Sequence, residues 1–155
     1  MDLNLSEMFA QNQGEPVHVD SRLVHSIYRR TVHSNECLRL DIVSARDAPP
    51  QGVRMKLKTG KVQIPGHEPL SDIVLWTNTA PKSVVFKCLT RQPSELRIWN
   101  CWRDDRNVMQ AWIGNAGLVL EETGKGVVRL SCNSRHELTF QDLVLELAEV
   151  ESDPG

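Results

Sequence analysis

Apolar and polar residues alternate with a period of two along much of this chain. Leu38, Leu40 and Ile42 alternate with Arg39 and Asp41. Because successive side chains of an extended strand point to opposite faces, this alternation predicts strands with one buried face. Similar patterns predict further strands, over residues 53–58, 72–77, 83–89, 96–103, 108–114, 117–122, 126–132 and 142–149.

Segments rich in proline, glycine or asparagine separate the predicted strands, as in DAPPQG at 47–52, NTAP at 78–81 and TGKG at 123–126. Such segments favour turns and interrupt regular structure. Many short strands with frequent turns are typical of an all-β fold, an antiparallel β-sandwich of jelly-roll-like type with at most a short N-terminal helix. The length of 155 residues fits one domain, residues 1–155.

Two hairpins can be placed in register from this pattern. A two-residue turn places Leu57 opposite Val62, so both side chains lie on one face. A three-residue loop at 123–125 places Leu120 opposite Val128 in a second hairpin. In both hairpins the turn residues and the apolar pattern agree.

The two ends of the chain differ from the strand region. Residues 1–16 form a polar segment whose few apolar positions predict a short docking helix, and residues 149–155 predict an acidic, flexible tail. Residues 20–26 are predicted as a helix or irregular lead-in followed by a strand, with a strand beginning at Ile27 as the alternative. The apolar positions of the first segment are Leu3, Leu5, Met8 and Phe9.

Three of the four tryptophans lie in one predicted hairpin. A four-residue loop at 104–107 places Arg103 opposite Val108, and the same register makes Trp99 and Trp112 a direct cross-strand pair. Trp102 then points to the opposite face and into the core, with Met109, Ala111 and Ile113. The face that holds the paired rings is formed by Arg97, Trp99, Cys101, Arg103, Val108, Gln110 and Trp112.

Two large rings beside Arg97, Arg103 and Gln110 are typical of a contact surface. We therefore expect a non-enzymatic module that uses this face to bind a protein partner or a second copy of itself. One alternative is a purely structural pair, covered by the N-terminal segment or another loop. Others are a saccharide that stacks on Trp99 and Trp112, and an uncharacterised hydrolase.

Composition narrows the expected partners. A formal charge of −2, from 18 basic and 20 acidic residues, gives no field that would collect nucleic acid or an anionic membrane. The sequence has no apolar run of membrane-spanning length and begins without a basic and apolar leader, so we expect a cytoplasmic protein. The four cysteines, which form no CxxC pair, are expected as buried free thiols.

The sequence contains no strong catalytic or cofactor motif. The five histidines are scattered, so no cofactor is expected. Asp104 and Asp105, beside Asn107, could offer oxygen ligands to calcium, but the pattern is more typical of a solvated turn. Cys101 is a weak candidate nucleophile because neighbouring arginines could lower the pKa of its thiol.

Residues 112–147, WIGNAGLVLEETGKGVVRLSCNSRHELTFQDLVLEL, resemble the closing half of galactose-binding-like β-sandwich lectins. In that family an IGN-G strand leads through a hairpin and an Asn-containing loop into a final alternating strand. The resemblance implies a sandwich fold and, in its calcium-dependent members, oxygen ligands from loops near the last strands. Asn133 and Asp142 lie in comparable places here, whereas the NNSG segment and its companion aspartate of those lectins are not evident.

Overall fold

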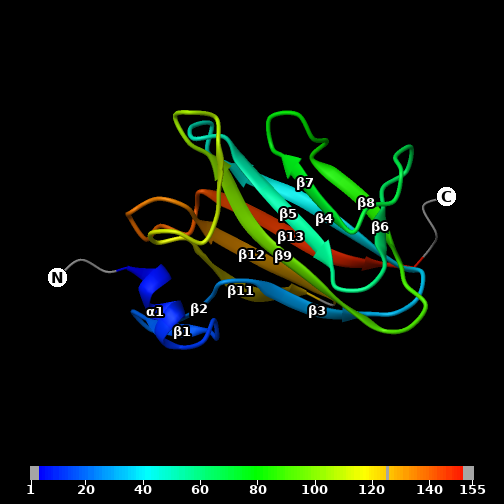
Figure 1. Ribbon diagram of the computed structural model, residues 1–155, viewed down its shortest axis with the longest axis horizontal. Coiled ribbons are helices and arrows are strands. Elements are labelled where there is room, and N and C mark those ends of the chain that lie inside the picture. The colour runs from blue at the N-terminus through cyan, green and yellow to red at the C-terminus, as the bar shows by residue number, and fades with distance from the viewer. Residues whose placement is uncertain (1–3, 125, 152–155) are drawn as a thin grey trace.

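Two antiparallel sheets lie one behind the other in Figure 1, and their facing sides enclose the apolar core. This computed structural model describes residues 4–124 and 126–151. The larger sheet has eight strands in the order β1-β2-β11-β12-β13-β4-β8-β6. Their bounds are β1 (Val17–Val19), β2 (Arg22–His25), β11 (Gly117–Gly124), β12 (Val127–Asn133), β13 (Leu143–Val150), β4 (Glu36–Ala45), β8 (Ser83–Leu89) and β6 (Lys61–Gln63).

The smaller sheet is built around β9 (Ser94–Arg103), which has neighbours on both sides. On one side β9 pairs with β5 (Gln51–Leu57), and β5 in turn pairs with β7 (Asp72–Trp76). On its other side β9 pairs with β3 (Tyr28–Val32) and with the two-residue β10 (Met109–Gln110). The predicted all-β antiparallel sandwich is therefore confirmed.

The core lies where the alternating residues of the two sheets meet. Leu38 and Leu40 of β4 face the other sheet and are buried, as the period-two pattern predicts. Ile98 and Met55, paired across β9 and β5, are also fully buried. Each such side chain contributes about 1.5–3 kcal/mol of burial free energy. This core fixes which face of β9 points outward.

The N-terminal segment forms α1 (Leu5–Gln11), a helix of seven residues. Asn4 caps it, because Oδ1 of Asn4 accepts a hydrogen bond from the amide of Glu7 at 3.2 Å. Leu5 and Phe9 are buried in a second apolar cluster with Val24 and Phe140, so the predicted docking helix is confirmed. No helix in the described part of the chain is long and apolar enough to cross a membrane.

The structure corrects two predictions for the ends of the chain. Residues 22–25 are the strand β2 rather than a helix or irregular lead-in, and β2 pairs with β1 and β11. Glu149 belongs to β13 and accepts a hydrogen bond from Arg30 at 2.6 Å, so the predicted tail does not begin there. Residues 152–155 of that tail lie outside the described residues.

Both predicted hairpin registers are wrong. Leu57 ends β5 in one sheet, whereas Val62 lies in β6 of the other sheet. The chain crosses between the sheets at Gly60, whose φ of +104° a side chain would strain. In the second hairpin Leu120 pairs with Leu130 instead of Val128, a two-residue shift that keeps the apolar residues on the same face.

Candidate functional site

The two rings of the predicted tryptophan pair are in contact on the outer face of the smaller sheet. The ring centroids of Trp99 and Trp112 are 4.7 Å apart and the ring planes differ by 27°, which is a stacked arrangement. Trp99 is only 4% exposed, whereas Trp112 is 44% exposed. Trp99 is therefore the buried base of the stack, and Trp112 covers it.

The predicted register of this hairpin is nevertheless wrong by one residue. Arg103 pairs with Met109 rather than Val108, and β10 ends at Gln110. Trp112 lies beyond the strand with φ of +59°, an uncommon conformation for a residue other than glycine. This backbone turn, rather than cross-strand pairing, brings its ring onto Trp99.

The hydrogen bonds of Asp104 account for the observed register of β9 and β10. One of its carboxylate oxygens accepts hydrogen bonds from the amides of Arg106 at 2.9 Å and Val108 at 3.0 Å. The amide of Asp104 also donates to the carbonyl of Val108 at 2.9 Å, which draws Val108 into a five-residue loop, 104–108. Gln110 completes this structure, because its side-chain amide donates to the other Asp104 oxygen at 2.9 Å.

These bonds define the role of Asp104. The hydrogen bonds, with that of the Val108 amide first, hold the pKa of the Asp104 carboxyl below its usual range. The predicted calcium ligand thus serves as an acceptor that shapes its own loop. Asp105 lies exposed beside it.

The predicted arginines do not gather at the tryptophan stack. Arg103 lies over the ring of Trp76, with its guanidinium carbon 4.2 Å from the ring centroid. Trp76 in turn packs against Gly52, where an added Cβ would meet its ring at 2.7 Å. Arg97 donates a hydrogen bond to Glu95 at 2.6 Å, which neutralises it locally.

Sequence reasoning missed the arginine that does contact the stack. The guanidinium carbon of Arg54 lies 5.5 Å from the ring centroid of Trp99, at a position directly across from Trp99 in the β5–β9 pair. Asp72 holds Arg54 through two hydrogen bonds, at 2.9 and 2.7 Å. The pKa of the Asp72 carboxyl is lowered, chiefly by this bond from Arg54. The sequence does not show that β5 pairs with β9, so it could not place Arg54 beside Trp99.

Trp112 is held in place from the side of the larger sheet as well. Its indole N–H donates to the carbonyl of Ser26 at 3.1 Å, in the connection between β2 and β3. Further along, the amide of Ser6 donates to the carbonyl of Gly114 at 2.9 Å. The amide of Leu5 donates to Oδ1 of Asn115, also at 2.9 Å. The start of α1 thereby fixes the segment that follows Trp112.

Four exposed apolar side chains lie within residues 108–113, and we call them the apolar ridge: Val108, Met109, Trp112 and Ile113. The prediction placed Met109 and Ile113 in the core, but the shifted register turns Met109 outward beside Arg103. Ile113 is 51% exposed in the connection to β11. The ridge holds four of the seven large apolar residues that are exposed in the described chain. Such clustering is a mark of contact surfaces.

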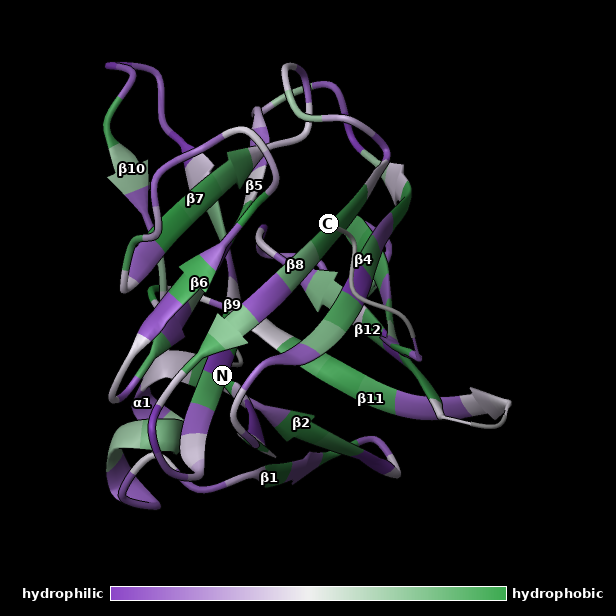
Figure 2. Cartoon of the chain, turned by 90° about the vertical axis from the view of Figure 1, so that its right-hand side faces the viewer, coloured by the Kyte–Doolittle hydropathy of each residue, from purple (hydrophilic) through white to green (hydrophobic). Residues whose placement is uncertain are grey.

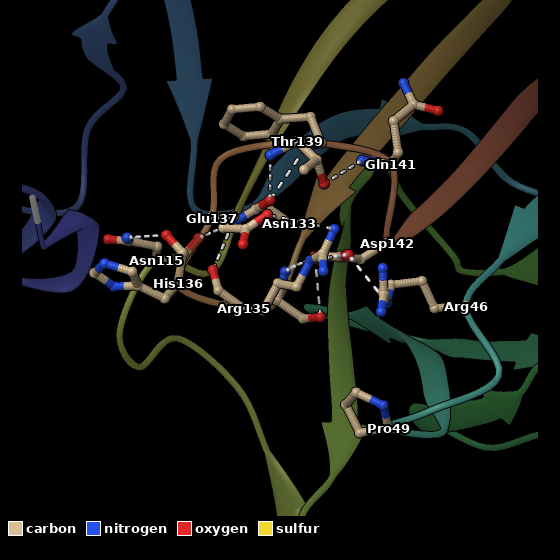
Figure 3. Close-up of polar contacts among 12 residues, drawn as sticks. Arg46, Pro49, Asn115, Asn133, Arg135, His136, Glu137, Thr139, Gln141 and Asp142 are labelled. Carbon is tan, nitrogen blue, oxygen red and sulfur yellow. Dashed lines mark hydrogen bonds and ion pairs between the residues drawn. The ribbon is translucent and has the colours of Figure 1, made fainter.

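Asn133 and Asp142, the two positions suggested by the lectin resemblance, lie in a buried polar network (Figure 3). Oδ1 of Asn133 accepts hydrogen bonds from the amides of Thr139 at 3.0 Å and Phe140 at 3.1 Å. Its amide group donates to the carbonyls of Asn115 and Arg135. Every polar group of Asn133 is thus used in holding two loops together, so its oxygen is not free for a metal.

Asp142 is fully buried, and arginines rather than other acids approach it. Oδ2 accepts a hydrogen bond from the amide of Ser134 at 2.8 Å. Oδ1 lies 3.1 Å from Nε of Arg135 and 3.6 Å from Nε of Arg46, as Figure 3 shows on its two sides. Two cations beside one carboxylate oppose cation binding. The described residues contain no group of three or more His, Cys, Asp or Glu side chains that could hold a metal ion.

Cys101 does not have the environment of a nucleophile. Burial raises the pKa of its thiol to about 11, and this effect outweighs the opposing charges of Arg54 and Arg103. All four cysteines are buried thiols that form no disulfide, as predicted. The hydrolase alternative therefore gains no support from Cys101.

The structure is an antiparallel β-sandwich with the Trp99–Trp112 stack on the outer face of its smaller sheet and three further exposed apolar side chains close to Trp112 in sequence. Comparisons of the chain with protein-family models, curated proteins and solved structures give no significant match. The functional argument therefore rests on the geometry of the side chains.

Proposed function

We propose that this protein is a non-enzymatic interaction module that binds a protein partner through the apolar ridge. The observation that carries the proposal is the exposure of Trp112, at 44%, within a segment whose other large apolar side chains are also exposed. Tryptophan and methionine are enriched at protein interfaces, and tryptophan is a frequent energetic hot spot.

Rigidity of the ridge supports the same proposal. Trp112 is fixed by its stacking on Trp99 and by its bond to Ser26. Asp104 and Gln110 fix the loop before it. A surface that is ordered before binding loses little conformational entropy when a partner docks, which favours affinity.

The charges beside the ridge indicate what the partner offers. Arg103 and Arg106 flank the ridge, and within residues 4–124 and 126–151 neither forms an ion pair with a carboxylate. A partner surface with apolar and acidic side chains complements this arrangement. A second copy of the chain is one such partner if its acidic residues meet these arginines.

Paired substitutions test the proposal. In a Met109→Ser/Trp112→Ser variant the ridge loses its two largest side chains, whereas the buried Trp99 remains. A Leu23→Ser/Val43→Ser variant is the matched control, because both residues are exposed to a similar extent but lie in the larger sheet. Light scattering measures self-association, and affinity capture with quantitative mass spectrometry measures other partners. We expect the ridge variant alone to bind its partner more weakly, with an affinity lower by about tenfold or more. Equal capture by both variants would contradict the proposal.

Saccharide binding is a second candidate, favoured by a hollow of about 440 Å³ next to Trp102. Arg135, His136 and Asn115 line it and offer polar groups that could bond hydroxyls. The expected stacking of a sugar on Trp99 is not supported, because Trp99 is buried, with Trp112 stacked on its ring and Arg54 over it. A glycan array run with calcium and with chelator tests this candidate. Selective binding that a His136→Ala change reduces would support it over the protein partner.

A further inference from the structure

The two sheets separate at one side of the sandwich and leave a groove of about 680 Å³. Figure 2 shows the elements around it, β6, β7 and β8, together on the side that faces the viewer. Volumes of about 300–1,000 Å³ are usual for binding sites. Most of the lining is apolar and comes from both sheets: Val62, Ile64, Leu70, Ile73, Leu75 and Val84.

One wall of the groove is the edge strand β7, whose backbone has an open side. Within the described residues β7 pairs with β5 alone. The amide of Leu57 donates to the carbonyl of Ser71 at 2.9 Å, and that of Thr77 to Gln51 at 3.0 Å. Because antiparallel bonding alternates along a strand, the odd-numbered residues of β7 face β5. The N–H and C=O groups of Asp72 and Val74 therefore point away from it.

The opposite edge of the groove is closed. Val62 of β6 and Leu70 exchange two backbone hydrogen bonds, at 2.7 and 3.0 Å. The carbonyl of Trp76 at the end of β7 is also used, since it accepts from the amides of Thr79 and Ala80. The central residue Val74 is thus the part of β7 where a new strand can pair.

The sequence of β7, DIVLW, lacks the residues that commonly protect an edge strand. Lysine, proline and inward charges commonly prevent edges from pairing with other chains. β7 has no lysine or proline, and its one charge, on Asp72, is held by Arg54. An apolar, uncharged edge beside an apolar groove is a template for strand addition.

We infer that β7 accepts an extended peptide segment of another protein as an additional strand. Alternate apolar side chains of that segment enter the groove over Ile73 and Leu75, while its backbone pairs with Val74. The open backbone favours a peptide over a small apolar molecule, which could not satisfy these groups. Glu68 also lies in the groove lining, where the described residues include no lysine or arginine, so a basic residue fits at the end of the segment.

This site differs from the apolar ridge of the proposed function, and the test keeps the two separate. A phage-displayed library of linear nine-residue peptides is selected against the wild-type protein, with a Trp112→Ser variant as a parallel target. We expect both targets to enrich the same peptides, with apolar residues at alternate positions and a flanking lysine or arginine. Loss of the peptides in the Trp112→Ser variant would place them on the ridge and overturn the inference.

An enriched peptide is then titrated into the protein labelled for NMR. We expect the amides of Asp72 and Val74 to shift and to become protected from hydrogen exchange. A fully N-methylated version keeps the side chains but lacks amide donors, and it should bind at least tenfold more weakly. The Val74→Pro variant should show the same loss, because this proline removes an N–H that does not bond to β5.

Three results would overturn the inference. One is a selection that enriches no peptide, and another is equal binding of the N-methylated peptide, which would indicate an apolar ligand site without strand pairing. The third is a dimer of the wild-type protein that Val74→Pro abolishes, because the edge would then be filled by a second copy. Should Val74→Pro fail to fold, the N-methylated peptide on wild-type protein decides alone.

Discussion

The ring of Trp112 rests on the ring of Trp99, with centroids 4.7 Å apart, and its indole N–H reaches the carbonyl of Ser26. One ring is buried and the other is half-exposed, so the two residues have different roles in the same contact. Trp99 stabilises the sheet, while Trp112 covers Trp99 and, in the proposed function, contacts the partner.

Single substitutions should separate these roles. Trp99→Ala leaves a large cavity beneath Trp112 and should lower the free energy of unfolding by about 3–5 kcal/mol. Trp112→Ala removes a stacked ring and one hydrogen bond, so we expect the free energy of unfolding to fall by about 1–2 kcal/mol. Urea unfolding followed by far-UV circular dichroism measures both, with the exposed Val43→Ala as control. Equal losses in the two variants would contradict the assignment of base and cover.

The polar network around Asn133 should be as important as an apolar core position. Asn133→Ala removes four hydrogen bonds and leaves the buried carbonyl of Asn115 and the buried amide of Phe140 unpaired. We expect a loss of about 3 kcal/mol or more in unfolding free energy. Gln141→Ala in the same loop changes an exposed side chain and should stay within about 0.5 kcal/mol of wild type. A stability of Asn133→Ala close to wild type would show that the loops hold without it.

Thiol reactivity tests the burial of the four cysteines. Burial raises the pKa of Cys101 to about 11 and that of Cys88 to about 12, so almost no thiolate exists at pH 8. The folded protein should react with a disulfide reagent far more slowly than the unfolded protein does, in which all four cysteines are accessible. Rapid labelling of Cys101 in the folded state, identified by peptide mass spectrometry, would reopen its role as a nucleophile.

The ion pair of Arg54 and Asp72 should make stability depend on acid pH. The pKa of the Asp72 carboxyl in the folded protein lies below its ordinary value of 3.8. The ionised carboxylate therefore stabilises the folded protein above pH 3.8. The contribution is lost as the pH falls through the folded-state pKa. Both side chains are about a third exposed, so we expect the ion pair to contribute less than about 1 kcal/mol to the free energy of unfolding.

Urea unfolding at pH 6 and pH 3 measures this effect. Asp72→Asn should lose less stability between the two values than wild type does, whereas Asp105→Asn removes an exposed charge outside the pair and should behave as wild type. An Asp72→Asn variant that is as acid-sensitive as wild type would show that the ion pair contributes nothing.

The alternation of residues predicted most of the strands but missed β2 and could not predict strand partners. Leu57 and Val62 are both buried, as expected, yet they belong to different sheets. Apolar periodicity specifies a buried face and is equally satisfied by any partner that buries that face. Pairing depends on the conformation at Gly60 and on contacts distant in sequence, which one strand pattern does not contain.

The candidate site was predictable in part for the same reason. Contact between Trp99 and Trp112 was foreseen, but the rotation at Trp112 that produces it comes from a positive φ with no sequence signature. Asp104 accepts hydrogen bonds within its own loop, and the resulting register differs by one residue from the predicted one. Met109 therefore points outward. Arg54 and Trp76 join the face from strands distant in sequence, so neither could be assigned to it.

Site-specific photo-crosslinking tests the interaction function most directly. A photoreactive amino acid replaces Met109 on the ridge in one protein and Val43 on the larger sheet in another, two exposed apolar positions that differ in location. Crosslinked products formed in cells are identified by mass spectrometry. We expect one partner, or a second copy of the chain, to be crosslinked from position 109 and not from position 43. An identical set of products from both positions would contradict the assignment of the ridge as a binding surface.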